Sequence, residues 1–321
     1  MQVKEGESVG FLKRMMSGGE TPEPGPAWAA PMNRADADAF VEALKADLHR
    51  RGLPHQVGEG HVSIERNGKS NDYGLTNLVQ LCHQVGRREW ATAIGSHFDN
   101  LFAAADADAE VRELARDFDG VRSMFKVRLY PGASLGGMNP NPPASWELAP
   151  GLTAAFVYDL PTTVSTANAE QVEAWGIGHD ELLAAALRNV RTDAVDAQTI
   201  GQDGASALVA CVADHFFAAS HALLLDERLP ESATAGAVFV VPHRHALLYA
   251  PLVDMGVVQS INELIQLGVS MFQQGPGSIS PGVYWWRDGS VTLLPAQFDG
   301  KAVQFSPPDE FVQVLNALPA P

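Results

Sequence analysis

Residues 151–190 read GLTAAFVYDLPTTVSTANAEQVEAWGIGHDELLAAALRNV, and this stretch decides the fold. Its first part, residues 152–160, is an apolar run rich in strand-forming residues, and Pro161 ends it. From His179 onward, apolar residues recur at helical spacing, and two acidic residues stand at the positive end of the helix dipole. The stretch therefore predicts a buried strand, a loop and a helix that faces the core.

The composition is that of a folded and strongly acidic protein. Of the 321 residues, 46% are hydrophobic and 19% are charged, which is typical of globular chains. The 38 acidic and 22 basic residues give a net charge of −16, and both sides of residue 120 are acidic. Such a chain offers no basic face to phosphate backbones, so we expect no nucleic-acid partner.

The two cysteines and the apolar runs bear on the cellular compartment. Cys82 and Cys211 are far apart in apolar surroundings, a pattern that predicts two reduced thiols rather than a disulfide framework or a metal site. No apolar run approaches the ~20 residues that cross a bilayer, and the N-terminus lacks the apolar core of a signal peptide. We therefore expect a cytoplasmic protein without membrane insertion and without a cofactor.

Three segments are expected along the chain. Residues 1–31 hold many prolines and glycines and predict a poorly ordered leader. Residues 32–120 predict an N-terminal helix–hairpin–helix subdomain, in which Gly86 divides the second helical region. Residues 121–321 predict the main domain, in which helices pack on mixed, mainly antiparallel sheets. The whole chain is expected to be α+β.

Further elements of the main domain follow from the same patterns. Strands are expected at residues 124–131, 206–212, 237–252 (in two segments), 283–286 and 291–295, and helices at 214–229, 260–273 and 307–318. The polar or glycine- and proline-rich stretches 132–150 and 192–204 are expected to be loops.

Four segments carry a resemblance to a known family: GLTAAFVYDLP (151–161), WGIGHDELLAAALRNV (175–190), FFAASHALL (216–224) and FVVPHRHALLYAP (239–251). Their order and spacing resemble the YtpQ-like family, a bacterial domain of unknown function. The resemblance implies an α+β fold and a cytoplasmic bacterial protein, and it brings no reaction and no functional residue. His243 stands where that family has a small hydroxyl residue.

A possible nucleophile lies in the segment GASLG, which has the G-x-S-x-G spacing with Ser134 at its centre. In α/β-hydrolases this serine stands between a strand and a helix. A strand precedes Ser134, but the continuation MNPNPPASWELAP is too rich in proline to form the helix. Acid and base could come from Asp159 and His179, or from Asp226 and His243. We interpret the segment as a loop and keep the hydrolase as the alternative.

The His-Arg-His segment at residues 243–245 is a polar insertion in an apolar strand. In an extended chain His243 and His245 share one face, so both could bind a metal if a third ligand came from elsewhere. A strand end with hydrogen-bonded histidines is the more ordinary interpretation, so no metal site is predicted. Arg244 points to the other face and is expected in a buried or cleft-facing ion pair, with Asp159 as its partner.

The hairpin signalled by Asp288 and Gly289 carries two adjacent tryptophans. Side chains alternate along a strand, so Trp285 and Trp286 are expected on opposite faces. One can complete the core, while the other remains available as a contact surface.

These patterns lead to one main functional hypothesis. We expect a non-catalytic protein that acts through contacts with a protein or peptide, with Trp285, Trp286, Arg244 and Asp159 as the binding residues. The alternative is a hydrolase or a metal-dependent enzyme that uses Ser134, or His243 and His245.

Overall fold

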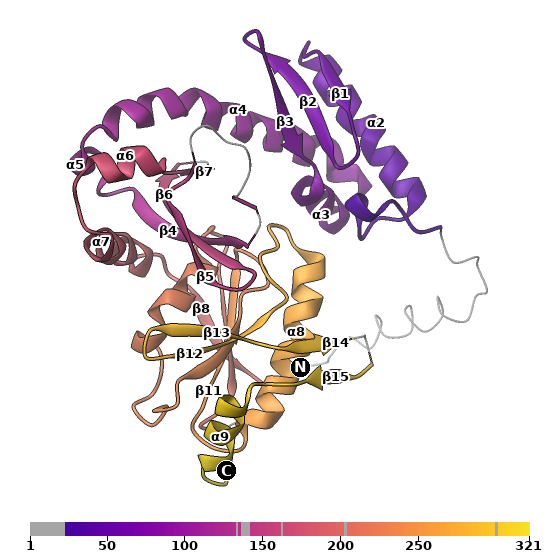
Figure 1. Cartoon of the computed structure of the whole chain (residues 1–321). Coiled ribbons are helices and arrows are strands. Elements are labelled where there is room, and N and C mark those ends of the chain that lie inside the picture. Colours follow the sequence, from indigo (N-terminus) through magenta and orange to yellow (C-terminus); the bar gives the residue numbers. More distant parts are fainter. Residues whose placement is uncertain (1–22, 133, 136–141, 162, 202–203, 299–300) are drawn as a thin grey trace, which may run out of the picture. The chain divides into compact units, whose positions relative to one another are not determined.

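The computed structural model describes residues 23–132, 134–135, 142–161, 163–201, 204–298 and 301–321. The chain divides into two compact units, Met1–Ala91 and Thr92–Pro321, each shown in Figure 1. We expected the division after residue 120. The division lies after Ala91 instead, because most of α4 (Trp90–Leu114) belongs to the larger unit. The last turns of this helix supply Val111 to the core of that unit.

The smaller unit contains the predicted helix and hairpin. Asn33 caps the first helix, since its Oδ1 accepts a hydrogen bond of 2.9 Å from the backbone N–H of Asp36. Gly86, with φ +76°, ends the second helix. The elements are η1 (Ala27–Ala29), α2 (Arg34–Arg50), β1 (His55–Val57), β2 (His61–Arg66), β3 (Lys69–Gly74), α3 (Thr76–Val85) and η2 (Arg87–Glu89).

Two features of this unit differ from the sequence analysis. Strand β3 was not predicted because its residues, KSNDYG, are polar and mostly exposed. Asn67 and Gly68 form the turn before it with positive φ angles, and this Asn-Gly pair was the overlooked signal. Residues 1–22 of the expected leader lie outside the described residues. The leader prediction is wrong for its last part, because Ala29 is fully buried in η1.

The first sheet of the larger unit is built around the strand that opens the decisive stretch. Strand β6 (Leu152–Leu160) is buried along most of its length and pairs antiparallel with β4 (Phe125–Pro131) on one side. On the other side it pairs with β5 (Ser145–Ala149) and then with β7 (Thr163–Thr166). Strand β5 lies in the stretch expected to be a loop, so that prediction is wrong there.

The second sheet has the strand order β13-β12-β10-β11-β9-β8, and all of its described pairs are antiparallel. Its strands are β8 (Asp196–Ile200), β9 (Leu208–Val212), β10 (Ala237–Val240), β11 (Ala246–Pro251), β12 (Val283–Arg287) and β13 (Ser290–Leu294). The edge strand β8 was expected to be a loop. Every residue in it is exposed, so no apolar alternation marks it.

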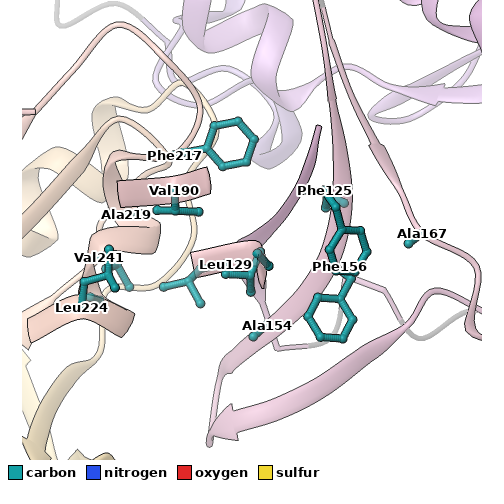
Figure 2. Close-up of a cluster of buried hydrophobic side chains, with 14 of the residues drawn as sticks. Phe125, Leu129, Ala154, Phe156, Ala167, Val190, Phe217, Ala219, Leu224 and Val241 are labelled. Atoms are coloured by element: carbon teal, nitrogen blue, oxygen red, sulfur yellow. The ribbon is translucent and has the colours of Figure 1, made fainter. Parts of the chain in front are cut away.

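Alternation along the second sheet shows that its two faces are covered differently. Val238 and Trp285 lie in a core formed with α8 (Val257–Gln274) and α9 (Asp309–Ala317). Phe239 and Tyr284 lie in a core shared with the first sheet, with α7 (His179–Arg191) and with η3 (Ala218–Glu227). Figure 2 shows part of this second core, in which side chains of the first sheet meet those of α7 and η3 and Val241, the residue after β10.

The remaining elements of the larger unit are short. They are α5 (Phe118–Val121), α6 (Ala169–Ala174) and the hairpin of β14 (Ala296–Phe298) and β15 (Val303–Phe305). With antiparallel sheets and helices packed on them, the predicted α+β class is confirmed. Within the described residues, no helix combines the length and the apolar character that crossing a membrane requires.

Candidate functional site

The hairpin of β12 and β13 places the two tryptophans on opposite faces of the second sheet. Trp285 is 4% exposed. Its Nε1 donates a hydrogen bond of 2.9 Å to the carbonyl oxygen of Ala235, and its ring packs edge-on against Phe311 at 5.2 Å. Because Trp285 is enclosed in this way, we remove it from the binding surface. It completes the core beneath α9 instead.

Trp286 lies on the other face, among side chains that pack against the buried core but are themselves only partly covered. It is half-buried and borders a groove of about 590 Å³. The apolar side chains of the groove come from β5, α7, η3 and the hairpin itself. They are Trp146, Leu148, Leu183, Leu187, Leu223, Trp286 and Val291. Each of them packs on the buried core but remains partly exposed, so the groove has an apolar floor that solvent reaches.

Side chains that line the groove are fixed in position because they pack against neighbouring aromatic residues. The ring of Trp146 packs against Phe156 at 5.0 Å and edge-on against His179 at 4.6 Å. His179 begins α7, so this contact ties β5 to the helix that supplies Leu183 and Leu187. Side chains placed by two sheets and a helix lose little freedom when a ligand binds.

Acidic side chains stand at the rim of the groove. Asp226 of η3 and Asp288 of the hairpin turn line it, and both are exposed. Asp288 lies 3.6 Å from the Nε of Arg287, an exposed pair that contributes little to stability. The groove therefore combines an apolar floor with a negative edge.

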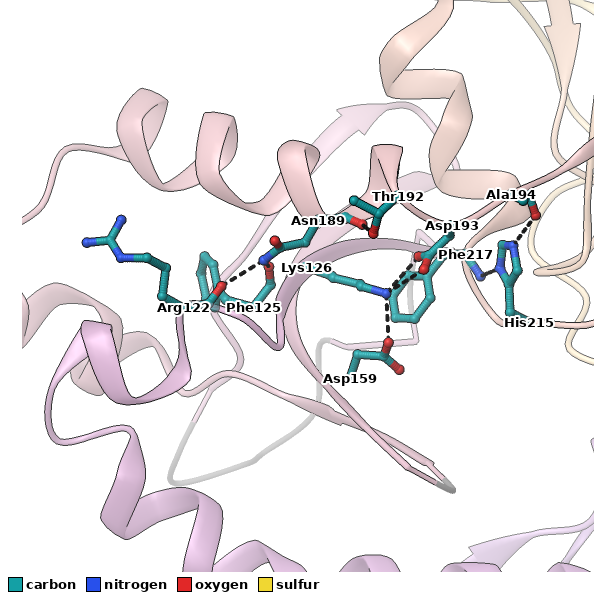
Figure 3. A network of polar contacts seen from close by, with 10 residues as sticks. All are labelled: Arg122, Phe125, Lys126, Asp159, Asn189, Thr192, Asp193, Ala194, His215 and Phe217. Carbon is teal, nitrogen blue, oxygen red and sulfur yellow. Dashed lines mark hydrogen bonds and ion pairs between the residues drawn. The ribbon is translucent and has the colours of Figure 1, made fainter.

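Asp159 has a different partner from the expected one. Its Oδ2 lies 2.7 Å from the Nζ of Lys126, and the same ammonium group lies 2.7 Å from Asp193, as Figure 3 shows. The Lys126 side chain is 8% exposed and stacks over the ring of Phe217. Strands β4 and β6 pair so that Lys126 opposes Val157, and Asp159 follows two residues later on the same face. The network joins β4, β6 and the segment that follows α7, so we assign Asp159 a structural role.

Arg244 has no acidic partner among the described residues, so the expected pair with Asp159 is wrong. Its Nε donates a hydrogen bond of 3.0 Å to Nε2 of His245, and its guanidinium group stacks over Phe216 at 4.5 Å. Burial and, next, the charge of Arg128 lower the pKa of Arg244 to about 10. Arg244 is therefore still a cation at neutral pH.

His245 has no lone pair left for a metal. Its Nδ1 faces the carbonyl oxygens of Ala213 and His215, so this nitrogen carries the hydrogen. Its Nε2 accepts the hydrogen bond from Arg244. The Nδ1 of His243 in turn accepts from the backbone N–H of His245. In the part of the chain that the structure describes, no three His, Cys, Asp or Glu side chains are grouped to hold a metal.

Ser134 is exposed, and its Oγ donates a hydrogen bond of 2.9 Å to the carbonyl oxygen of Pro131. Ser134 is thus bonded back to the last residue of β4. Residues 133 and 136–141 lie outside the described residues, and they include Ala133 and Gly136 of the predicted motif.

Comparison of the chain with protein-family models, with curated proteins and with solved structures found no match. The resemblance to the YtpQ-like family therefore stays a prediction.

We predicted Trp286 as a contact residue, but not the residues that surround it. Leu183 and Leu187 were grouped with the buried positions of the same helix, and Trp146 lay in a proline-rich stretch. The apolar alternation of Trp146 and Leu148 around exposed Glu147 was the signal that could have revealed β5.

Proposed function

We propose that the protein binds a short segment of a partner protein in the groove beside Trp286 and that it acts without catalysis. The observation that carries this proposal is the set of seven half-buried apolar side chains that converge there from separate elements. Apolar surface that stays gathered and partly exposed is typical of contact sites. A half-buried tryptophan that lines such a site is the usual kind of binding anchor.

The proposed occupant is a segment with large apolar side chains next to a lysine or arginine. A volume of about 590 Å³ suits a few side chains rather than the face of a whole domain. Asp226 and Asp288 at the rim, together with a net charge of −16, favour a basic flank and disfavour an acidic one.

We also propose that the protein works in the cytoplasm. Cys82 and Cys211 are both buried free thiols, which supports a reducing compartment. The alternative, an enzyme that uses Ser134 or His243 and His245, gains no comparable support. The hydroxyl of Ser134 is directed to a backbone carbonyl, and both ring nitrogens of His245 are engaged.

A display library of random peptides, selected on the whole protein, tests the proposal. We expect enrichment of peptides with aromatic or aliphatic residues beside lysine or arginine, and we expect Trp286→Ala to lose them. Trp28→Ala is the matched control, because Trp28 is also half-buried but lies in the smaller unit. Equal retention of the selected peptides by Trp286→Ala would contradict the proposal. So would a dimer that Trp286→Ala dissociates, because a second copy would then be the occupant.

A further inference from the structure

Strand β4 places two cations on one face, and they differ in whether a carboxylate pairs with them. Lys126 and Arg128 are two residues apart, so their side chains leave the strand on the same side. Lys126 lies between the carboxylates of Asp159 and Asp193. Arg128 has no carboxylate partner in the described part of the chain, and its buried Nε makes no hydrogen bond there.

Arg128 and Arg244 share an aromatic ring. The Cζ of Arg128 lies 5.6 Å from the centre of the Phe216 ring, and that of Arg244 lies 4.5 Å from it. Arg128 also lies over the ring of Tyr130 at 4.9 Å. Two half-buried guanidinium groups are therefore held beside one phenyl group. No described carboxylate pairs with either of them, and the phenol of Tyr130 interacts with both.

The position of Arg244 is fixed along its whole length. Gly277 lies beside its stem, since a Cβ on this glycine would stand 2.8 Å from the Cδ of Arg244. The ring of Phe216 faces the guanidinium group, and His245 accepts from its Nε. The two terminal nitrogens of Arg244 have no partner among the described residues, so their N–H groups are free to donate to a ligand.

Two neighbouring cations repel each other, and this repulsion destabilises the folded protein when no counterion offsets it. The chain has 38 acidic residues, yet no described carboxylate pairs with Arg128 or Arg244. Burial is the main cause of the lowered pKa of Arg244, and the charge of Arg128 lowers it further. An anion between the two guanidinium groups would remove this repulsion and satisfy their N–H donors. Phe216 would remain as the apolar wall of the site.

We propose that Arg128 and Arg244 bind the phosphate group of a small soluble ligand. Two guanidinium groups supply two positive charges and more donors than one carboxylate can accept, which matches a dianion with several oxygens. The ligand is small because a net charge of −16 repels an extended polyanion such as a nucleic acid. This inference does not depend on the function proposed for the groove.

Titration of the whole protein with inorganic phosphate at constant ionic strength tests the site. We expect calorimetry to detect binding, and we expect the melting temperature to rise with phosphate concentration. Arg128→Gln and Arg244→Gln should each raise the dissociation constant at least about tenfold. Arg122→Gln is the matched control, because Arg122 also stacks on a phenyl ring at 4.5 Å but is paired with Asp119. It should leave binding unchanged.

Three results would contradict phosphate binding by Arg128 and Arg244. Unchanged phosphate affinity in both glutamine variants, or no phosphate binding to the wild type, would overturn the proposal. Acetate that binds as tightly as phosphate at the same ionic strength would also overturn it, because the site would then be a carboxylate site. If either glutamine variant fails to fold, Arg128→Lys and Arg244→Lys replace them. These variants keep the charge but lose the planar fork, and they should still weaken phosphate binding.

Discussion

Different elements cover the two faces of the second sheet, and the adjacent residues Trp285 and Trp286 are therefore buried to different extents. On one face α8 and α9 enclose Trp285, and its indole N–H finds a backbone carbonyl. On the other face the core extends to the first sheet but leaves Trp286 half-exposed at a groove. Identical side chains one residue apart thus differ in burial, and the elements that cover each face decide how far each tryptophan is enclosed.

The largest expected effect comes from the enclosed face. Trp285→Ala should lower the free energy of unfolding by ~3–5 kcal/mol, because it leaves a cavity against Phe311 and removes a hydrogen bond to Ala235. Urea unfolding monitored by circular dichroism measures the loss. Trp28→Ala serves as the control for losing a half-buried tryptophan elsewhere. A loss below about 1 kcal/mol would mean that α9 does not seal this face.

The next largest expected effect is a loss of folding stability at acid pH, and it arises in η3, which supplies Leu223 and Asp226 to the groove. His221 of this helix is 1% exposed, and burial, followed by the charge of Arg228, lowers its pKa to about 4. The unfolded chain has a histidine pKa near 6.5, so it binds the proton first as pH falls. The stability that neutral His221 contributes is therefore present above about pH 6.5 and is lost as pH falls toward 4.

This loss can be measured by urea unfolding at pH 7 and at pH 5. We expect the wild type to lose about 2 kcal/mol from His221 over this interval, and His221→Gln to lose that much less. Glutamine still offers an acceptor to Arg228. His243 has a pKa lowered to about 4, chiefly by burial, and adds to the acid loss in both proteins. The exposed His83→Gln is the control. Identical pH dependence in wild type and His221→Gln would rule out the role assigned to His221.

A smaller effect is expected at the rim of the groove. Asp226→Asn should weaken binding of a selected lysine-bearing peptide by ~0.2–1 kcal/mol, because the exposed charge acts through water. The salt dependence of the dissociation constant should fall with it. Titration at low and high salt measures both, with Asp119→Asn as the control for an exposed aspartate outside the groove. Tighter binding by Asp226→Asn would show that the partner is not basic.

The enclosed face was easier to predict than the groove, for a physical reason. The hairpin follows from Asp288 and Gly289, which take the positive φ angles of a two-residue turn, and alternation then separates the tryptophans. These determinants are local. The position of Trp146 depends instead on the pairing of β5 with β6, including a register shift between Glu147 and Ala149. No short pattern in the sequence encodes that pairing.

The sequence also does not predict that the groove residues are only half-buried. Leu183 and Leu187 have the spacing of a helical core face, and they would be fully buried if another element covered them. A sequence pattern reports which side chains are apolar, whereas the extent of their covering depends on distant segments. The pairing of Asp159 with Lys126 rather than Arg244 has the same origin, since it depends on the register of β4 and β6.

The dissociation constant of one selected peptide, measured by calorimetry for wild type, Trp285→Ala and Trp286→Ala, tests the central claim most directly. Trp286→Ala should weaken binding by ~2 kcal/mol or more, as loss of an anchor does, while its melting temperature stays close to that of the wild type. Trp285→Ala, measured below its lowered melting temperature, should bind nearly as well as the wild type. Unchanged affinity in Trp286→Ala, or a fall in melting temperature as large as that of Trp285→Ala, would contradict the claim that Trp286 forms the binding face.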